Sequence, residues 1–143
     1  ILGSQVDGAH VVCYLTMSGV LERFPRLQFV TVETGSAWLA WVLTSMDEIA
    51  EKHAMWAQPT LALRPSEYVR RQGHVTFQND PVGIHNRTFT GIDALLWGSD
   101  YPHPEGTWPD SRAAVAAQMR GVPDDEQAKM LGGTTARLFG FDA

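Results

Sequence analysis

One stretch of the sequence decides the fold, LLWGSDYPHPEGTWP at residues 95–109. Its first part belongs to an apolar run at 94–98, which has the length and composition of a buried β-strand. The run ends at Ser99 and Asp100, and a proline-rich loop at 101–109 follows. An acidic residue directly after a buried strand stands where α/β proteins carry their functional groups. Asp100 is therefore the first candidate site residue.

Two further segments have the same strand-like composition. Residues 27–32 end at Glu33, and residues 74–78 end at Asn79 and Asp80. Apolar periodicity and the positions of proline and glycine predict helices between and after the strands. The predicted helices lie at about 11–24, 38–53, 66–72, 81 onward, 111–120, 123–131 and 135–139. Residues 1–10 are expected to be a loose lead-in.

The order of these segments predicts the fold class. Helices that alternate with strands predict an α/β fold with parallel strands near 27–33, 74–79 and 94–99 and with flanking helices. Because the C-terminal ends of parallel strands lie at one edge of a sheet, the acidic residues after them are expected to gather there. Ser36 and Ser66 are predicted to cap helices, and Asn79 and Asp80 to cap the helix that begins at Pro81. Three tryptophans are expected to pack on helix faces, namely Trp38, Trp41 and Trp56.

Length and composition restrict the possible functions. The chain has 143 residues, the size of a single domain at 1–143. A net charge of −5 without a basic patch argues against a nucleic-acid partner. No apolar run approaches the ~20 residues of a membrane span, and no signal peptide is visible, so we expect a cytoplasmic protein without a membrane partner. The lone Cys13 is expected to be a small buried hydrophobic residue. A start at Ile1 is compatible with a fragment or a processed chain.

Several segments together resemble one known family. They are GVLERFP at 19–25, which precedes a strand, WGSDYPH at 97–103, EGTWP at 105–109, and the tail GTTARLFG at 133–140. This set resembles the amidohydrolase-2 family over nearly the whole chain, from Ser18 to Asp142. The segment at 97–103 is the most specific, because it resembles the family's signature at barrel strand eight.

The resemblance implies a TIM-type barrel with a divalent metal, zinc first, at the top of the barrel. Family members hydrolyse amide, ester or lactone-like bonds, or decarboxylate aromatic and muconate-like acids. Their metal ligands are an HxH pair at strand one, a His at strand five and the Asp at strand eight. Only the last has a counterpart here, Asp100, which the resemblance makes both a metal ligand and a catalytic residue. The chain has no HxH, it carries Glu33 where many decarboxylating members have His, and it carries Thr134 where the family usually has Asn.

A full barrel needs about 250 residues, so the sequence predicts a partial barrel of about three of the eight βα units. Three residues are candidates for contacts with a small-molecule substrate, and each has a structural alternative. His103 contacts substrate or orders its own loop. Glu33 orients the substrate or caps the helix after Ser36, and Trp108 lines the pocket or packs within the loop.

Three functions fit these observations. The chain is the C-terminal segment of a metal-dependent hydrolase or non-oxidative decarboxylase, inactive in isolation and without metal of its own. Alternatively it is a truncated non-catalytic relative that forms an oligomer, or a small-molecule binding module without metal. In each case a homo-oligomer is expected, because a partial barrel leaves sheet edges open. The face that would line the closed barrel is predicted to carry Phe29, Phe77 and Leu96 or Trp97.

Overall fold

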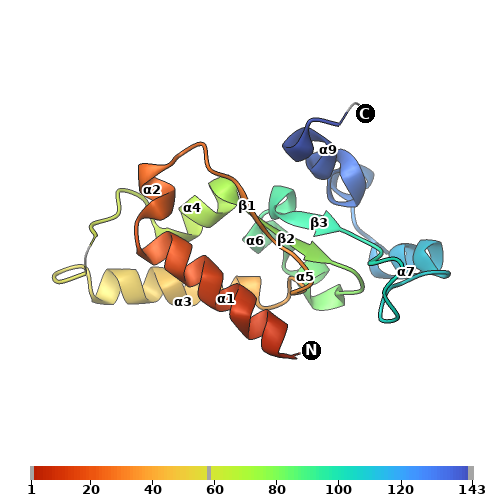
Figure 1. Ribbon diagram of the computed structural model, residues 1–143, viewed down its shortest axis with the longest axis horizontal. Helices are drawn as coiled ribbons and strands as arrows, with labels where there is room; N and C mark the ends of the chain where they lie inside the picture. The colour runs from red at the N-terminus through yellow and green to blue at the C-terminus, as the bar shows by residue number, and fades with distance from the viewer. Residues whose placement is uncertain (1, 58, 142–143) are drawn as a thin grey trace.

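The computed structural model describes residues 2–57 and 59–141, and within them three strands form one parallel sheet (Figure 1). The strands are β1 (Phe29–Thr31), β2 (Gly73–Phe77) and β3 (Leu95–Trp97), in the order β1-β2-β3. Both pairings are parallel, with Phe29 opposite Gly73 and Val75 opposite Leu95. The predicted parallel sheet is therefore confirmed. The two outer strands are shorter than predicted because each pairs only where it lies beside β2.

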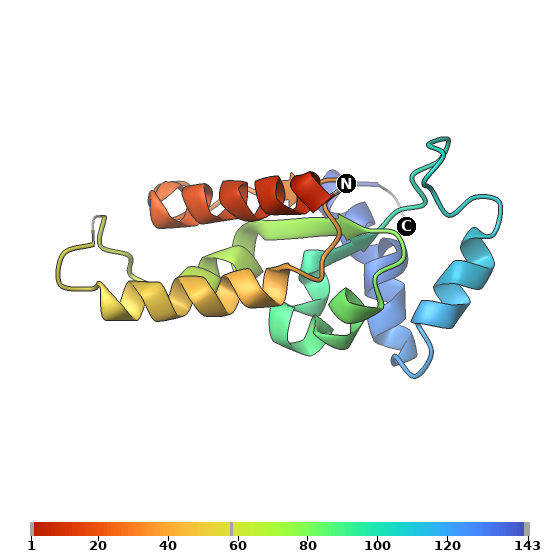
Figure 2. The ribbon, with the colours of Figure 1, turned by 90° about the horizontal axis from the view of Figure 1, so that it is seen from below.

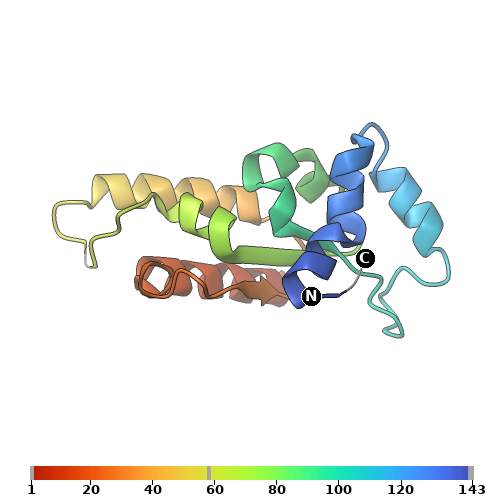
Figure 3. The ribbon, with the colours of Figure 1, turned by 90° about the horizontal axis from the view of Figure 1, so that it is seen from above.

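Helices connect and flank these strands. In chain order they are α1 (Leu2–Met17), α2 (Val20–Arg23), α3 (Leu39–Lys52), α4 (Pro65–Gln72), α5 (Pro81–His85), α6 (Arg87–Thr90), the 3₁₀ turn η1 (Ile92–Ala94), α7 (Ser111–Gln118), α8 (Asp124–Ala128), the π-helical turn η2 (Lys129–Gly133) and α9 (Thr134–Phe139). Helix α1 runs antiparallel to β2 and begins at the end of the molecule where β2 finishes (Figure 2). Figure 3 shows α1 and α3 extending beyond the sheet at one end, with α7 at the other. None of the helices in the described residues is long and apolar enough to cross a bilayer.

The first helix differs from the prediction. Residues 2–10 belong to α1 and are not a loose lead-in, since Ala9 is buried in the core. The single helix predicted at 11–24 is wrong, because Gly19 interrupts it with a φ of 73°. A Cβ at Gly19 would lie 2.7 Å from Cγ of Pro59, so both the backbone angle and the lack of space require glycine here.

Several smaller expectations about helix ends and faces are also corrected. Ser36 lies before α3, whose first helical residue is Leu39, and Ser66 lies inside α4, which begins at Pro65. Both serine side chains bond to aspartates instead. Trp38 is buried as expected, but Trp41 and Trp56 are 67% and 68% exposed. The predicted helix at 123–131 is divided between α8 and η2.

The core lies on one face of the sheet, together with buried side chains of α1, α3 and α4. Residues paired in parallel strands share a face, so Phe29, Val75 and Leu95 lie on one side, and Phe77 and Trp97 lie there too. All of them belong to the core or pack against it.

The predicted barrel-lining face is therefore wrong for Phe29, Phe77 and Trp97. The chain's own helices cover those side chains. The opposite face carries Val30, His74, Thr76 and Leu96.

Candidate functional site

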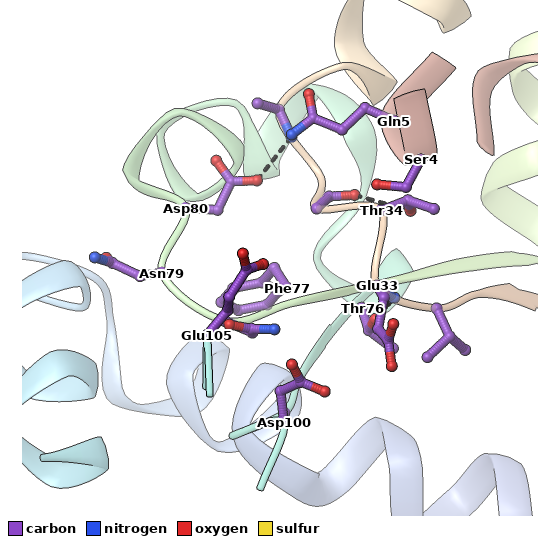
Figure 4. A pocket seen from close by; sticks show the side chains of 15 residues that line it. Ser4, Gln5, Glu33, Thr34, Thr76, Phe77, Asn79, Asp80, Asp100 and Glu105 are labelled. Carbon is purple, nitrogen blue, oxygen red and sulfur yellow. Dashed lines mark hydrogen bonds between the residues drawn. The ribbon is translucent and has the colours of Figure 1, made fainter. Parts of the chain in front are cut away.

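A pocket of about 540 Å³ lies at the C-terminal ends of the three strands, the edge where α/β proteins bind ligands. Figure 4 shows side chains from several segments around this space, among them those of Glu33, Asp100 and Glu105. The pocket is lined by Ser4, Gln5, Val32, Glu33, Thr34, Gly35, Ala37, Thr76, Phe77, Gln78, Asn79, Asp80, Gly98, Asp100 and Glu105. The predicted gathering of strand-end acids is thus present, since Glu33, Asp80 and Asp100 all face this pocket.

Two of these acids have an unusual backbone. Among the described residues, Glu33 and Asp100 are the non-glycine residues with positive φ, at 59° and 58°. Left-handed geometry is uncommon for residues other than glycine, less so for Asp than for Glu, and it clusters at functional sites when the surrounding structure enforces it. For Glu33 the enforcing contact is visible, because its N–H donates to Oγ1 of Thr76 on β2 (3.0 Å). Both strands therefore turn sharply at the pocket and place a carboxylate there.

The loop after β3 holds Asp100 in place. The Thr107 N–H donates to the Ser99 carbonyl (2.9 Å), and the His103 N–H donates to the Asp100 carbonyl (2.8 Å). A Cβ on Gly106 would lie 2.7 Å from the Ser99 oxygen and 2.9 Å from the Asp100 oxygen. Only glycine allows the loop to fold this tightly over the end of the strand. The loop is therefore a compact turn that fixes Asp100 at the pocket.

His103 contacts Asp100 but does not line the pocket. Its Nδ1 lies 3.3 Å from Oδ2 of Asp100 and 3.4 Å from the Glu105 nitrogen. When Nδ1 carries a proton it donates to Asp100, and without one it accepts from the Glu105 N–H, so it makes one of these bonds at a time. In the structure, His103 therefore contacts Asp100 and its own loop. A substrate contact stays a prediction.

Trp108 lies outside the pocket. It is 65% exposed, and its ring meets that of Tyr101 edge to face at a centroid distance of 5.4 Å. The loop-packing alternative accounts for this contact, and substrate binding by Trp108 stays a prediction.

Asp80 has a structural role. Its Oδ2 accepts from the Ser36 N–H (2.7 Å), the Ser36 hydroxyl (2.9 Å) and the Ala37 N–H (2.8 Å), and its Oδ1 accepts from the Gly83 N–H (2.8 Å). One carboxylate therefore caps α5 and ties down the turn that leads into α3. The prediction that Asp80 caps the helix beginning at Pro81 is confirmed, and its contacts leave little of its charge for a ligand.

Among the polar side chains at the pocket, Ser4, Gln5 and Glu105 were not predicted from the sequence. Ser4 and Gln5 reach it from the first turn of α1, which was not predicted to be helical. Glu105 lies in the loop at 101–109, three residues before Trp108, but a loop sequence does not show which side chains turn inward. Only the hydrogen-bonded path of the loop brings Glu105 to the pocket.

Two titrating groups with shifted pKa values lie away from the pocket and are structural. Burial lowers the pKa of His74, whose Nδ1 is 2.9 Å from the Asp93 carbonyl oxygen. The Arg137 guanidinium, 2.8 Å from Oδ1 of Asp93, lowers the pKa of that carboxyl. These contacts link β2, η1 and α9, so the surroundings of His74 give it a structural role.

The pocket offers one candidate ligand for a metal ion, the carboxylate of Asp100. Within residues 2–57 and 59–141, no group of three His, Cys, Asp or Glu side chains is arranged to hold a metal ion. Asp100 offers a carboxylate whose side chain is 18% exposed and reaches the pocket. Such an oxygen is a suitable ligand for a divalent ion, but the described chain does not complete the site by itself.

Comparison with known proteins gives a family and a fold. A family model described as amidohydrolase matches residues 5–141. The structure is similar to that of 5-carboxyvanillate decarboxylase from Sphingomonas paucimobilis, with a TM-score of 0.77 and 24% identity over 94% of this chain. It is also similar to an amidohydrolase from Mycobacterium avium subsp. paratuberculosis, with a TM-score of 0.78 and 22% identity over 92% of this chain.

The chain spans only part of these proteins, 40% of the first and 33% of the second. Its three parallel strands with flanking helices are therefore part of a TIM-type barrel, as the sequence predicted.

Proposed function

The chain belongs to the amidohydrolase family, and on that premise we propose that it is the C-terminal segment of an enzyme that hydrolyses a small organic substrate with the help of a divalent metal. Members of this family generally use divalent metals, and we take zinc as the first candidate. Coverage of 40% and 33% of the two similar structures supports the view that further βα units complete the barrel.

One observation carries this proposal. Asp100 follows β3 directly, has a left-handed backbone, and reaches the pocket at the C-terminal end of the sheet. Active sites of barrels of this type lie at that end. The loop holds the Asp100 backbone in this left-handed conformation, which supports a role for its side chain as a fixed ligand or proton acceptor.

The role of each residue follows from its place. A divalent metal, when bound, polarises the substrate and lowers the pKa of a water molecule. Asp100 would hold the ion as one oxygen ligand and accept a proton from the attacking water. His103, at 3.3 Å, would orient the Asp100 carboxylate. Glu33 would face the substrate from the end of β1, and Trp108 would act only if the substrate extends beyond the pocket.

The metal content of the purified full-length protein that carries this segment provides the first test. Elemental analysis is expected to find a divalent metal, and less of it in the Asp100→Asn variant, which keeps the shape of the side chain but loses its charge. The 143-residue chain alone is expected to be inactive, because one carboxylate does not complete a metal site.

Hydrolysis of a panel of small esters, lactones and amides provides the second test. Asp100→Asn should reduce turnover by about 10²–10⁴-fold, the usual contribution of a proton acceptor. The matched control is Asp125→Asn, an exposed acid on α8, which should keep full turnover. Near-full turnover in Asp100→Asn would show that Asp100 serves only the structure.

A further inference from the structure

Helix α3 and the turn after it expose several large apolar side chains. Trp41 and Trp56 are each about two-thirds exposed, Ile49 is 51% exposed, and Met55 is 90% exposed. At about 100° per residue, Trp41 and Ile49 lie within about 80° of each other around the helix. The buried side chains of α3 lie on the other side of the helix. The four exposed residues are called the α3 stripe below.

The stripe has the apolar area that a protein interface needs. A buried Trp removes about 150–250 Å² from water, so two that are two-thirds exposed leave roughly 200–330 Å². Ile49 and Met55 add roughly 60–120 Å² each. A standard interface covers about 800 Å² on each partner, of which about 450–520 Å² is apolar. The stripe therefore supplies most of that apolar area, and Trp is the residue type most enriched in binding hot spots.

Further units of the barrel would not cover this stripe. In a TIM-type barrel the helices form an outer ring, in which each helix packs beside the helices before and after it. Helix α3 has such neighbours within this chain, since it contacts α1, α4 and α6. Additional βα units would join at the free edges of β1 and β3, whereas α3 connects β1 to β2. Figures 2 and 3 show α3 at the outer margin of the molecule.

The exposed apolar side chains of α1 are a different case. Val11 and Tyr14 are also exposed, but α1 precedes β1, which is an edge strand of the described sheet. A preceding βα unit would pack beside α1 and cover them. What covers the α3 stripe is therefore another molecule, not another part of the barrel.

The spacing along α3 suits a second copy of the same chain. Trp41 precedes Ile49 by eight residues and Trp56 follows it by seven, so the stripe is nearly symmetric about Ile49. A two-fold axis near Ile49 would place Trp41 of one copy against Trp56 of an antiparallel second copy. Glu48 and Lys52, which form an exposed ion pair, lie close to that axis. The same two-fold brings the acid of each copy toward the base of the other, so the charges at the contact are complementary.

We propose that the α3 stripe is the contact between two copies of this protein, related by a two-fold axis that passes near Ile49. None of the four stripe residues lines the pocket at the C-terminal ends of the strands. The contact is thus separate from the candidate site, and it does not depend on which reaction that site performs.

Sedimentation equilibrium of the full-length protein that carries this segment tests the contact, because a closed barrel has no sheet edge through which copies could associate. The protein is expected to be a dimer at micromolar concentration. The Trp41→Lys, Trp56→Lys double variant should raise the Kd of the dimer at least about 100-fold, since both hot-spot candidates are lost from each copy. The matched control is Trp108→Lys, which replaces a tryptophan of similar exposure in the loop at 101–109 and should leave the Kd unchanged.

Cross-linking locates the axis and does not depend on how well the double variant folds. In Cys13→Ser protein, a short bismaleimide should join two copies through Ile49→Cys, because the two thiols would lie on either side of the axis. Asp125→Cys, at an exposed position on α8, should give no more cross-linked dimer than the Cys13→Ser protein alone. A monomeric full-length protein would overturn the proposal and assign the stripe to a different partner. A dimer that does not cross-link through Ile49→Cys, or whose Kd a folded double variant leaves unchanged, would overturn it as well.

Discussion

Replacement of Asp80 by Asn should destabilise the fold severely, although the residue lines the same pocket as Asp100. Its carboxylate accepts hydrogen bonds from two neighbouring backbone N–H groups of Ser36 and Ala37, from the Ser36 hydroxyl and from the Gly83 N–H. An Asn side chain can keep the bond from Gly83, and the Ser36 hydroxyl can rotate to accept from the new amide. The N–H groups of Ser36 and Ala37 then face an NH₂ group and lose their acceptor.

The expected cost follows from these two bonds. A hydrogen bond to a charged group contributes about 1.5–3 kcal/mol, so the loss of two predicts a decrease of about 3 kcal/mol or more in the free energy of unfolding. Small domains have a total of about 5–15 kcal/mol, so the variant should lose a large part of its stability. With a urea m-value of about 2 kcal/mol/M, the midpoint should fall by about 1.5 M.

Urea denaturation followed by circular dichroism measures this change. Asn79→Ala, next to Asp80 and exposed, is the matched control and should stay within about 0.5 kcal/mol of the wild type. Asp100→Asn should also cost less than about 1 kcal/mol, because within residues 2–57 and 59–141 the side chain of Asp100 has only the weak contact with His103. A loss below about 1 kcal/mol for Asp80→Asn would refute the structural assignment of this carboxylate.

Further predictions concern the loop, the pH dependence and the assembly. Gly106→Ala should lower the free energy of unfolding by about 1–3 kcal/mol, because its Cβ would lie 2.7 Å from the Ser99 oxygen, and a urea midpoint equal to that of the wild type would contradict this. Because burial lowers the pKa of His74, the unfolded chain binds a proton more readily than the folded chain. The free energy of unfolding should therefore fall as pH drops through about 6.5, the unfolded value. Urea midpoints at several pH values should show a smaller fall in His74→Gln. The chain should be a dimer or higher oligomer in light scattering at micromolar concentration, since β1 and β3 are both edge strands of the described sheet, and a clean monomer would argue against it.

The sequence by itself determined the fold class and the position of Asp100, the strongest candidate for a functional residue. Strands of buried composition that end in acidic residues, with helical periodicity between them, predict parallel βα units, because a parallel connection needs a crossover. The same pattern places Glu33, Asp80 and Asp100 at one edge. It also identified Asp80 as a cap, since an Asp before Pro81 is a local signal that needs no knowledge of the fold.

Tertiary structure alone decided which side chains share a space and which face of the sheet is covered. The side-chain direction in a strand reverses with each residue, so the register between strands, and not composition, put Phe29, Phe77 and Trp97 on the core face. Glu105 reaches the pocket only because the loop folds back so that Thr107 bonds to the Ser99 carbonyl. The loop sequence alone does not predict this contact or the direction of the Glu105 side chain. The charge of the pocket wall is a sum over segments far apart in the chain, and it exists only once the fold has brought them together.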